Sequence, residues 1–315
     1  MAVRSKDISE AKKILEKGGL VAIPTETVYG LAANALEESA IIRIYKAKNR
    51  PAFDPLIAHV SGFDQVSSIA ADVPELGKKL MEKFWPGPLT LLLPKKPAVP
   101  DILTSGLPRV AVRMPDHPLT LALLQQLEFP LAAPSANPFG YVSPTTADHV
   151  MDQLGDSIDM ILDGGPTRVG VESTIVSLEH DTIVVNRVGG LSLEQLNPFG
   201  KVLLNVNQSS NPSAPGMLKS HYAPGKKLII GDIDALMQQY AHYKYAILSF
   251  YKDYRGPNCI VLSPEKSLET AAKNLFAALR ELDKKDIDII LTESFPDHGL
   301  GRAINDRLRR ASASN

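Results

Sequence analysis

The chain has 315 residues, of which 44% are hydrophobic and 22% charged, a balance typical of one large or two ordinary soluble domains. Its formal net charge of −1 excludes a polycation that binds nucleic acid through overall charge, so any such contact requires a local patch. The single cysteine, Cys259, excludes an intramolecular disulfide and disfavours a cysteine zinc site. There is no apolar signal region and no run of about 18 apolar residues, so we expect a cytoplasmic protein without a membrane segment.

The first two thirds of the chain mix short strands with amphipathic helices. A capping-box spacing at Asp7-Ile8-Ser9-Glu10 begins a helix that Gly18-Gly19 ends, and residues 20–23 form an apolar strand. A second helix fits residues 37–48, with Ala40, Ile41, Ile44 and Tyr45 facing inward. Because strands and helices do not strictly alternate, the pattern predicts a twisted mixed sheet. Further strands are expected at 56–60, 89–93, 109–113, 130–133, 160–162, 173–178 and 182–188, and further helices at 74–84, 118–127 and 145–154.

The composition changes after residue 204. Residues 205–215 are rich in Asn, Ser and Pro, and neither they nor residues 216–225 show a helix or strand period, which indicates a linker. Beyond it the pattern alternates again and predicts a smaller Rossmann-like α/β domain with a largely parallel sheet. The expected strands are 227–230, 245–250, 258–262 and 287–291, and the expected helices are 233–240, 270–282 and 300–310. The predicted division is 1–204, linker 205–225, and 226–315.

Several cations stand where a predicted helix or strand ends. Lys48 and Arg50 lie just before Pro51, at what we expect to be an exposed helix end, where they either compensate the helix dipole or bind an anion. Arg109 and Arg113 share one face of a predicted strand, roughly 13 Å apart at ~3.3 Å per residue. They would form an open positive shelf that faces either solvent or a carboxylate or phosphate. Arg187 ends another strand.

Small hydroxyl and amide side chains accompany these cations. Thr25 and Thr27 are two residues apart, so an extended segment would turn both hydroxyls to one side. Ser135 and Asn137 follow a predicted strand, where turn chemistry is the alternative explanation. Ser143 precedes Pro144 as a helix N-cap would, and a helix N-terminus also attracts anions.

Familiar catalytic motifs are absent from the sequence. It has no G-x-x-x-x-G-K-[ST], G-x-G-x-x-G, H-E-x-x-H or G-x-S-x-G, and no cysteine with a plausible partner histidine. Covalent nucleophilic catalysis is therefore unsupported. What remains is a binding-driven reaction in which cations and hydroxyls hold anionic groups in line.

Taken together, Ile23-Pro24-Thr25-Glu26-Thr27-Val28-Tyr29-Gly30, Lys46-Ala47-Lys48-Asn49-Arg50-Pro51 and Ala132-Ala133-Pro134-Ser135-Ala136-Asn137 resemble the YrdC/YwlC family of L-threonylcarbamoyladenylate synthases. The resemblance runs from about residue 8 to the C-terminus, and the block from Pro215 to Pro224 resembles its two-domain form. It implies a nucleotidyltransferase that makes threonylcarbamoyl-AMP and pyrophosphate from L-threonine, bicarbonate and ATP. Downstream transferase proteins would use this product for N6-threonylcarbamoyl modification of adenosine 37 in tRNA.

The resemblance also implies site residues. The family's K-x-R falls on Lys48 and Arg50, which would be the catalytic pair, and Mg²⁺ would be held through the ATP phosphates with no protein metal site. The linker would close over ATP as a lid, with Tyr222 against the nucleotide and His221 nearby. ATP contacts would fall on Lys48, Arg50, Asp54, Arg109, Ser135, Asn137, Ser143, Arg187 and Tyr222; threonine contacts would fall on Thr27, His59, Arg113, Ala133 and Ser173.

The chain departs from the family pattern at two places. Asp54 stands where asparagine is usual, which would put a negative charge near the phosphates. The usual R-P-G is here Arg187-Val188-Gly189.

Two alternatives stay open. One is an RNA-binding module of the same fold without catalysis, and direct tRNA contact is left open in either case. The other is a synthase with a related α/β fold, such as a dihydroxybutanone-phosphate synthase. Aromatic residues make up only 6% of the chain, which disfavours the RNA-binding module. The absence of an acidic cluster disfavours the other synthase.

Overall fold

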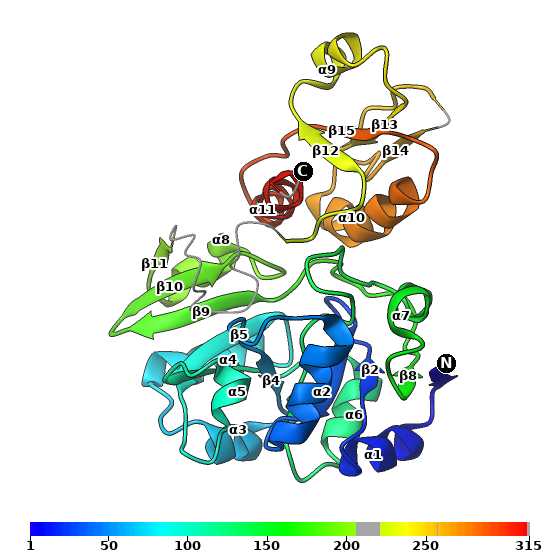
Figure 1. Cartoon of the computed structure of the whole chain (residues 1–315). Coiled ribbons are helices and arrows are strands. Elements are labelled where there is room, and N and C mark those ends of the chain that lie inside the picture. Colours follow the sequence, from blue (N-terminus) through cyan, green and yellow to red (C-terminus); the bar gives the residue numbers. More distant parts are fainter. Residues whose placement is uncertain (206–220, 257, 314–315) are drawn as a thin grey trace.

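The computed structural model describes residues 1–205, 221–256 and 258–313, which fold into two α/β bodies stacked one on the other (Figure 1). In the larger body, the described residues form a mixed sheet of eleven strands in the order β1-β8-β2-β3-β7-β4-β6-β5-β9-β10-β11. These strands are β1 (Val3–Ser5), β2 (Val21–Ile23), β3 (Gly30–Asn34), β4 (Ile57–His59), β5 (Leu89–Pro94), β6 (Arg109–Arg113), β7 (Leu131–Ala132), β8 (Met160–Leu162), β9 (Thr174–Glu179), β10 (Thr182–Arg187) and β11 (Lys201–Leu204).

Helices α1, α2, α4, α6 and α7 of the larger body follow predicted amphipathic patterns. Helix α2 buries Ala40, Ile41, Ile44 and Tyr45 and ends at Asn49, which adopts a left-handed conformation. The helices are α1 (Ile8–Glu16), α2 (Glu38–Lys48), α3 (Phe63–Ile69), α4 (Glu75–Phe84), α5 (Asp101–Thr104), α6 (Pro118–Leu124), α7 (Ala147–Leu154) and α8 (Leu193–Leu196), and a short 3-10 helix, η1 (Asn197–Phe199), precedes β11.

Strand β6 lies beside the middle strand of the large sheet, β4, to which it is parallel, and it is antiparallel to β5. Val110 and Val112 enter the main core. Alternation turns Ala111 to the other face, where it packs against Ile57 of β4. The candidate site lies on this second face.

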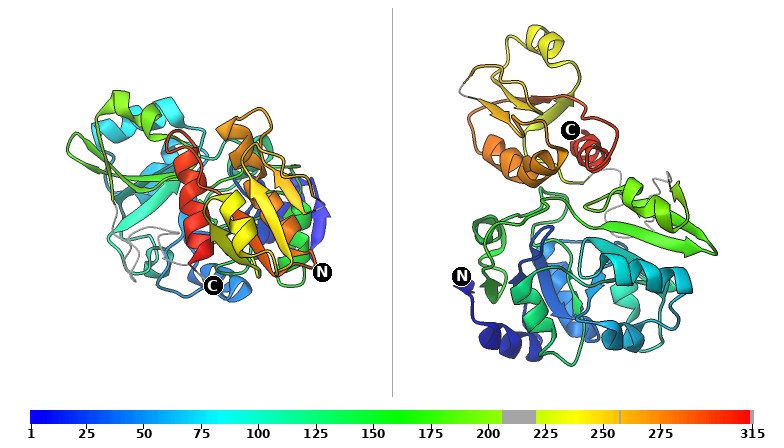
Figure 2. Two further views of the ribbon diagram at one scale, coloured as in Figure 1. Left: turned by 90° about the horizontal axis from the view of Figure 1, so that it is seen from above. Right: turned by 180° about the vertical axis from the view of Figure 1, so that it is seen from behind.

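The smaller body contains a parallel sheet of four strands among its described residues, in the order β12-β15-β13-β14. Helices α10 and α11 lie between this sheet and the larger body (Figures 1 and 2). One hydrophobic cluster joins Val28, Val142 and Val171 of the larger body to Phe276 of α10, so the two bodies share a core. The elements are β12 (Lys227–Ile230), α9 (Ile233–Gln239), β13 (Tyr245–Ser249), β14 (Cys259–Val261), α10 (Leu268–Asp283), β15 (Ile289–Thr292) and α11 (Gly301–Ser312).

These two sheets confirm the predicted fold class: a mixed-sheet body followed by a smaller Rossmann-like one. The predicted boundaries at 204 and 226 stay a prediction, although the first sheet ends with β11 and the second begins with β12. Most of the predicted linker lies outside the described residues, and with it most of the predicted lid.

The sequence prediction omitted β1, β3, β11 and the helices α3, α5 and α8. Strand β3 reads Gly-Leu-Ala-Ala-Asn and contains no β-branched or aromatic residue, so its strand propensity is low. Pairing with β2 and β7 on its two sides overrides that propensity. Gly30 lets the two strands approach closely, because a Cβ atom there would make a tight contact of 3.2 Å with the Cβ of Ala133.

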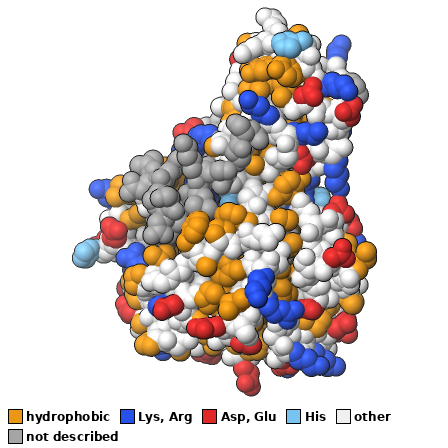
Figure 3. Space-filling model, in the orientation of Figure 1, with side chains coloured by type: hydrophobic (Ala, Val, Ile, Leu, Met, Phe, Trp, Pro, Cys, Tyr) orange, Lys and Arg blue, Asp and Glu red, His pale blue; other side chains and the backbone are white. Residues whose placement is uncertain are grey.

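In the part of the chain that the structure describes, no helix has the length and apolar character to span a membrane. On the face that Figure 3 shows, Lys and Arg side chains are interspersed with Asp and Glu and do not gather into one basic patch. This mixed surface agrees with the net charge of −1.

Candidate active site

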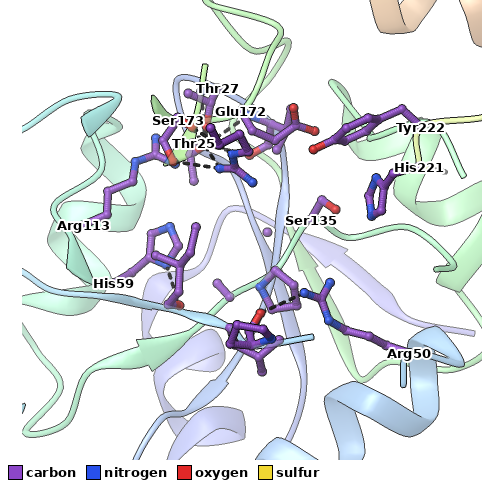
Figure 4. A pocket seen from close by; sticks show the side chains of 18 residues that line it. Thr25, Thr27, Arg50, His59, Arg113, Ser135, Glu172, Ser173, His221 and Tyr222 are labelled. Carbon is purple, nitrogen blue, oxygen red and sulfur yellow. Dashed lines mark hydrogen bonds between the residues drawn. The ribbon is translucent and has the colours of Figure 1, made fainter. Parts of the chain in front are cut away.

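One cavity brings together side chains from segments far apart in the sequence. Its volume is about 540 Å³ including the open mouth. Arg113 and His59 lie on one side of it, while His221 and Tyr222 lie on the other (Figure 4). The lining residues are Thr25, Thr27, Val28, Gly30, Arg50, Pro55, Leu56, Ile57, His59, Arg113, Ala133, Pro134, Ser135, Glu172, Ser173, Arg187, His221 and Tyr222.

Thr25 organises the turn between β2 and β3. Its hydroxyl donates to the Val28 carbonyl at 2.6 Å and lies 2.8 Å from the Thr27 hydroxyl. The backbone N–H groups of Thr27 and Val28 both reach the same oxygen at 3.2 Å. The expected extended segment is thus a bend, although Thr25 and Thr27 both line the cavity. Since Thr25 donates to Val28, Thr27 donates to Thr25, and the oxygen of Thr27 keeps acceptor capacity for a ligand.

A buried ion pair fixes Arg113. Its Nη2 lies 2.6 Å from Glu26 Oε1, and both side chains are almost fully buried. Its Nε donates to the Gly87 carbonyl at 3.2 Å. Arg109 is exposed at the opposite end of β6. The expectation of an open shelf shared by Arg109 and Arg113 is therefore wrong, because Arg113 is held by a carboxylate that the strand pattern does not reveal.

His59 ends β4 beside Arg113 and is 2% exposed. Burial, together with the positive charge of Arg113, lowers the pKa of His59 to about 3. The imidazole is consequently neutral at physiological pH. Its Nδ1 lies 3.3 Å from the Ile57 carbonyl, which orients the ring along the cavity wall.

Ser173 connects Arg187 to Thr90. Arg187 donates from Nη2 to the Ser173 carbonyl at 2.9 Å and to its hydroxyl at 3.1 Å. The Ser173 hydroxyl also lies 2.7 Å from the Thr90 hydroxyl. These contacts fix a guanidinium and a hydroxyl side by side on the cavity wall.

Arg50 is held by the loop that follows it. Its Nη2 lies 2.9 Å from Asp54 Oδ2 and donates to the Pro55 carbonyl at 2.8 Å. At 8% exposure it does not lie on an exposed helix end, so that expectation is wrong. Asp54 is fully buried and serves as the counterion of Arg50. Its charge is therefore matched within the protein, rather than presented alone to a bound anion.

Lys48 is also buried, at 1% exposure, although we expected it on an exposed helix end. It continues the buried face of α2, since it lies seven residues after Ile41 and four after Ile44. Its Nζ donates to the carbonyls of Ser135 and Asn137. Burial, and then the charge of Arg50, lowers the pKa of Lys48 well below its ordinary value. Lys48 supports the Ser135 wall from behind.

Glu172 stands between the two bodies. Its Oε1 accepts a hydrogen bond from the Ser143 hydroxyl at 2.5 Å, and its Oε2 lies 2.7 Å from Nε of Arg307 in α11. The Arg307 guanidinium lies over the ring of Tyr222, 4.8 Å from its centroid. Tyr222 is 1% exposed and stacks on Phe276 of α10, so the smaller body supplies the backing for this side of the cavity.

The structure therefore divides the predicted residues into two groups. All five residues predicted for threonine line the cavity: Thr27, His59, Arg113, Ala133 and Ser173. Of those predicted for ATP, Arg50, Ser135, Arg187 and Tyr222 line it, while Lys48, Asp54, Asn137, Ser143 and Arg109 do not.

The residues that do not line the cavity still lie close to its wall. Asn137 donates to the Pro138 and Tyr141 carbonyls at 2.9 Å each, which shapes the loop after β7. The β4–β6 register pairs Ile57 with Ala111, so Arg109, two residues earlier, is level with the cavity residue Pro55. Glu26, Glu172 and Arg307 were not predicted, because single buried charges carry no periodic signal.

The arrangement can bind and orient anions. The cavity wall carries three arginines and several hydroxyls, and no histidine in the described wall is hydrogen-bonded to a serine or cysteine. A nucleophile–base pair is therefore not formed in the described wall of this cavity. Fixed guanidinium groups suit carboxylate and phosphate groups.

Two family models match the chain. One, described as telomere recombination and covering Sua5, YciO and YrdC, matches residues 13–189, and one described as the C-terminal domain of threonylcarbamoyl-AMP synthase matches residues 191–313. The threonylcarbamoyl-AMP synthase of Pyrococcus abyssi is 42% identical over 96% of this chain and 93% of its own length. The threonylcarbamoyl-AMP synthase of Bacillus subtilis is 42% identical over 99% of this chain and 94% of its own length. The structure of P. abyssi Sua5 complexed with L-threonine has a TM-score of 0.93 at 41% identity and covers 99% of this chain and 97% of that one.

Proposed function

Because this chain belongs to the Sua5/YciO/YrdC family, we propose that it is a threonylcarbamoyl-AMP synthase that joins L-threonine, bicarbonate and ATP and releases pyrophosphate. The observation that carries the proposal is the cavity itself. It gathers all five positions predicted for threonine, in a chain that superposes on a relative complexed with L-threonine.

Threonine would occupy the end of the cavity near β4 and β6. Arg113 suits the carboxylate, because its guanidinium is already fixed by Glu26 and keeps further N–H groups. Thr27 and Ser173 supply hydroxyls, and neutral His59 provides a polar surface without adding charge. A neutral imidazole also avoids repelling the substrate ammonium group.

ATP would occupy the end near Arg50, Ser135 and Tyr222. Arg50 and Arg187 supply phosphate contacts, and Tyr222 forms part of the wall beside them. Lys48, Asp54, Asn137 and Ser143 would act by holding that wall, and Arg109 by extending its outer rim.

In the proposed reaction, the amine of threonine takes up CO₂ or bicarbonate to give a carbamate. A carbamate oxygen then attacks the α-phosphorus of ATP, and pyrophosphate leaves. The protein needs no nucleophile for this step. Its task is to hold two anions in contact, and the arginines of the cavity offset their repulsion. Downstream tRNA threonylcarbamoyl-transferase proteins would consume the product.

We propose that Mg²⁺ arrives bound to the ATP phosphates and lowers their charge. Among the described residues, no group of three or more His, Cys, Asp or Glu side chains is arranged to hold a metal ion. An ion coordinated mainly by phosphate and water oxygens would need no such group.

Pyrophosphate release by the purified protein tests the proposal. We expect release only when threonine, bicarbonate and ATP are all present. Omitting each in turn is the control. Release that does not depend on threonine would refute the assignment. Salt-dependent tRNA binding without such release would instead favour the RNA-binding alternative.

A further inference from the structure

Arg307 is the largest fully buried side chain among the described residues, and it belongs to the smaller body. Besides Glu172, its guanidinium contacts Asp306 at 2.6 Å and the Val188 carbonyl at 3.1 Å. Val188 directly follows Arg187 of the cavity. A single side chain from α11 therefore touches the carboxylate, the tyrosine ring and the strand end that form one side of the cavity.

Glu172 needs such a partner. It is 6% exposed and is the one carboxylate in the described cavity wall, which otherwise carries Arg50, Arg113 and Arg187. Arg50 and Arg113 are each matched by a buried carboxylate of their own, Asp54 and Glu26.

Without Arg307, Glu172 would present an uncompensated negative charge to a triphosphate and a carbamate held against the same wall. Asp306 does not replace Glu172 as a partner for Arg307, because Asp306 also pairs with Arg310 at 3.0 Å.

We propose that Arg307 is a positioning residue through which the smaller body neutralises Glu172 and so completes the anion-binding charge of the active site. The proposal rests on the proposed function, since it assigns Arg307 a part in binding the same anionic substrates. Arg307 touches no reacting atom. It acts by cancelling the charge of Glu172, by fixing that carboxylate against Ser143 and by backing Tyr222.

The chain offers a matched control. Arg302 lies on the same helix and also bridges the two bodies, through an ion pair with Glu194 of α8 at 2.5 Å. Neither Arg302 nor Glu194 lines the cavity. Arg302→Met therefore removes an ion pair between the bodies without changing the charge of the site.

The experiment compares the wild type, Arg302→Met, Arg307→Met, Glu172→Gln and the double variant Arg307→Met/Glu172→Gln. For each, KM and kcat are measured for ATP and threonine, and ATP binding is measured by calorimetry. We expect Arg307→Met to raise KM for ATP at least about tenfold, the equivalent of about 1.4 kcal/mol of lost anion binding. Adding Glu172→Gln should restore KM to within about threefold of the Glu172→Gln single variant, and Arg302→Met should match the wild type.

A merely structural role for Arg307 would leave the double variant as impaired as Arg307→Met, and that result would overturn the proposal. KM for Arg307→Met equal to that of Arg302→Met would also overturn it.

If Arg307→Met does not fold, the comparison of Glu172→Gln with the double variant carries the test, because neither has the carboxylate. A tenfold gap between these two contradicts the proposal. An inactive wild type that still binds ATP would refute the proposed function instead, and calorimetry would still test Arg307.

Discussion

Replacing Lys48 by methionine tests whether this residue supports the cavity wall from within the core. The substitution keeps the aliphatic stem but removes the ammonium group that donates to the Ser135 and Asn137 carbonyls. Both acceptors then lose a charged donor at a place where Lys48 is only 1% exposed.

Each buried carbonyl that loses its partner costs roughly 1–3 kcal/mol, and relief from burying an ammonium group offsets part of this. We therefore expect Lys48→Met to lower the free energy of unfolding by about 2–4 kcal/mol. Turnover should fall as well, because Ser135 lines the cavity and even a 1 Å displacement of a positioning group can cost roughly 100-fold.

Urea denaturation and turnover are measured on the same preparations, with Lys46→Met as the control. Lys46 lies on the last turn of the same helix but is exposed, so its replacement should change stability by no more than about 0.5 kcal/mol. A Lys48→Met variant as stable as Lys46→Met would refute the reasoning. If that stable variant had also lost turnover, Lys48 would act on the substrate without supporting the wall.

Three further predictions follow from the site. First, His59 takes up a proton near pH 6.5 when unfolded but only near pH 3 when folded, so its burial destabilises the fold as the pH falls below about 6.5; between about pH 7.5 and 5.5 His59 alone should contribute a loss of about 1.4 kcal/mol, and in urea titrations the loss of His59→Gln should be smaller by that amount. An identical pH dependence in both proteins would contradict this. Second, Asp54→Asn should lower KM for ATP, because Arg50 loses its counterion but keeps its bonds to the Asp54 and Pro55 carbonyls, while stability falls by about 1–3 kcal/mol; a raised KM would argue against it. Third, serine should have a kcat/KM at least about fivefold below that of threonine, since a missing methyl group costs ~1 kcal/mol or more, and equal values would remove the threonine pocket assignment.

Periodicity in the sequence predicted most of the strands and helices, but it missed elements whose residues lack propensity. Strand β3 is the clearest case, because only its two neighbouring strands make Leu31-Ala32-Ala33 a strand. Lys48 illustrates a signal that was present. Its position on the Ile41–Ile44 face of α2 predicts burial. We instead interpreted it as a cation at an exposed helix end, because the helix ends near Pro51.

The charges of the site could be predicted only in part. Arg113 was assigned to the threonine site by the family resemblance, but its partner Glu26 lies 87 residues away in a turn without a period. Glu172 and Arg307 are 135 residues apart and meet only because α11 packs on the larger body. Such pairs depend on tertiary packing, which no local pattern encodes.

The most direct test of the central claim is to detect the product itself. The protein is incubated with threonine, ATP and isotopically labelled bicarbonate, and the nucleotide products are separated and identified by mass. We predict threonylcarbamoyl-AMP that carries the heavy carbon, formed in equal amount with pyrophosphate. Release of pyrophosphate with AMP alone, or an adenylate without the heavy carbon, would contradict the proposed reaction.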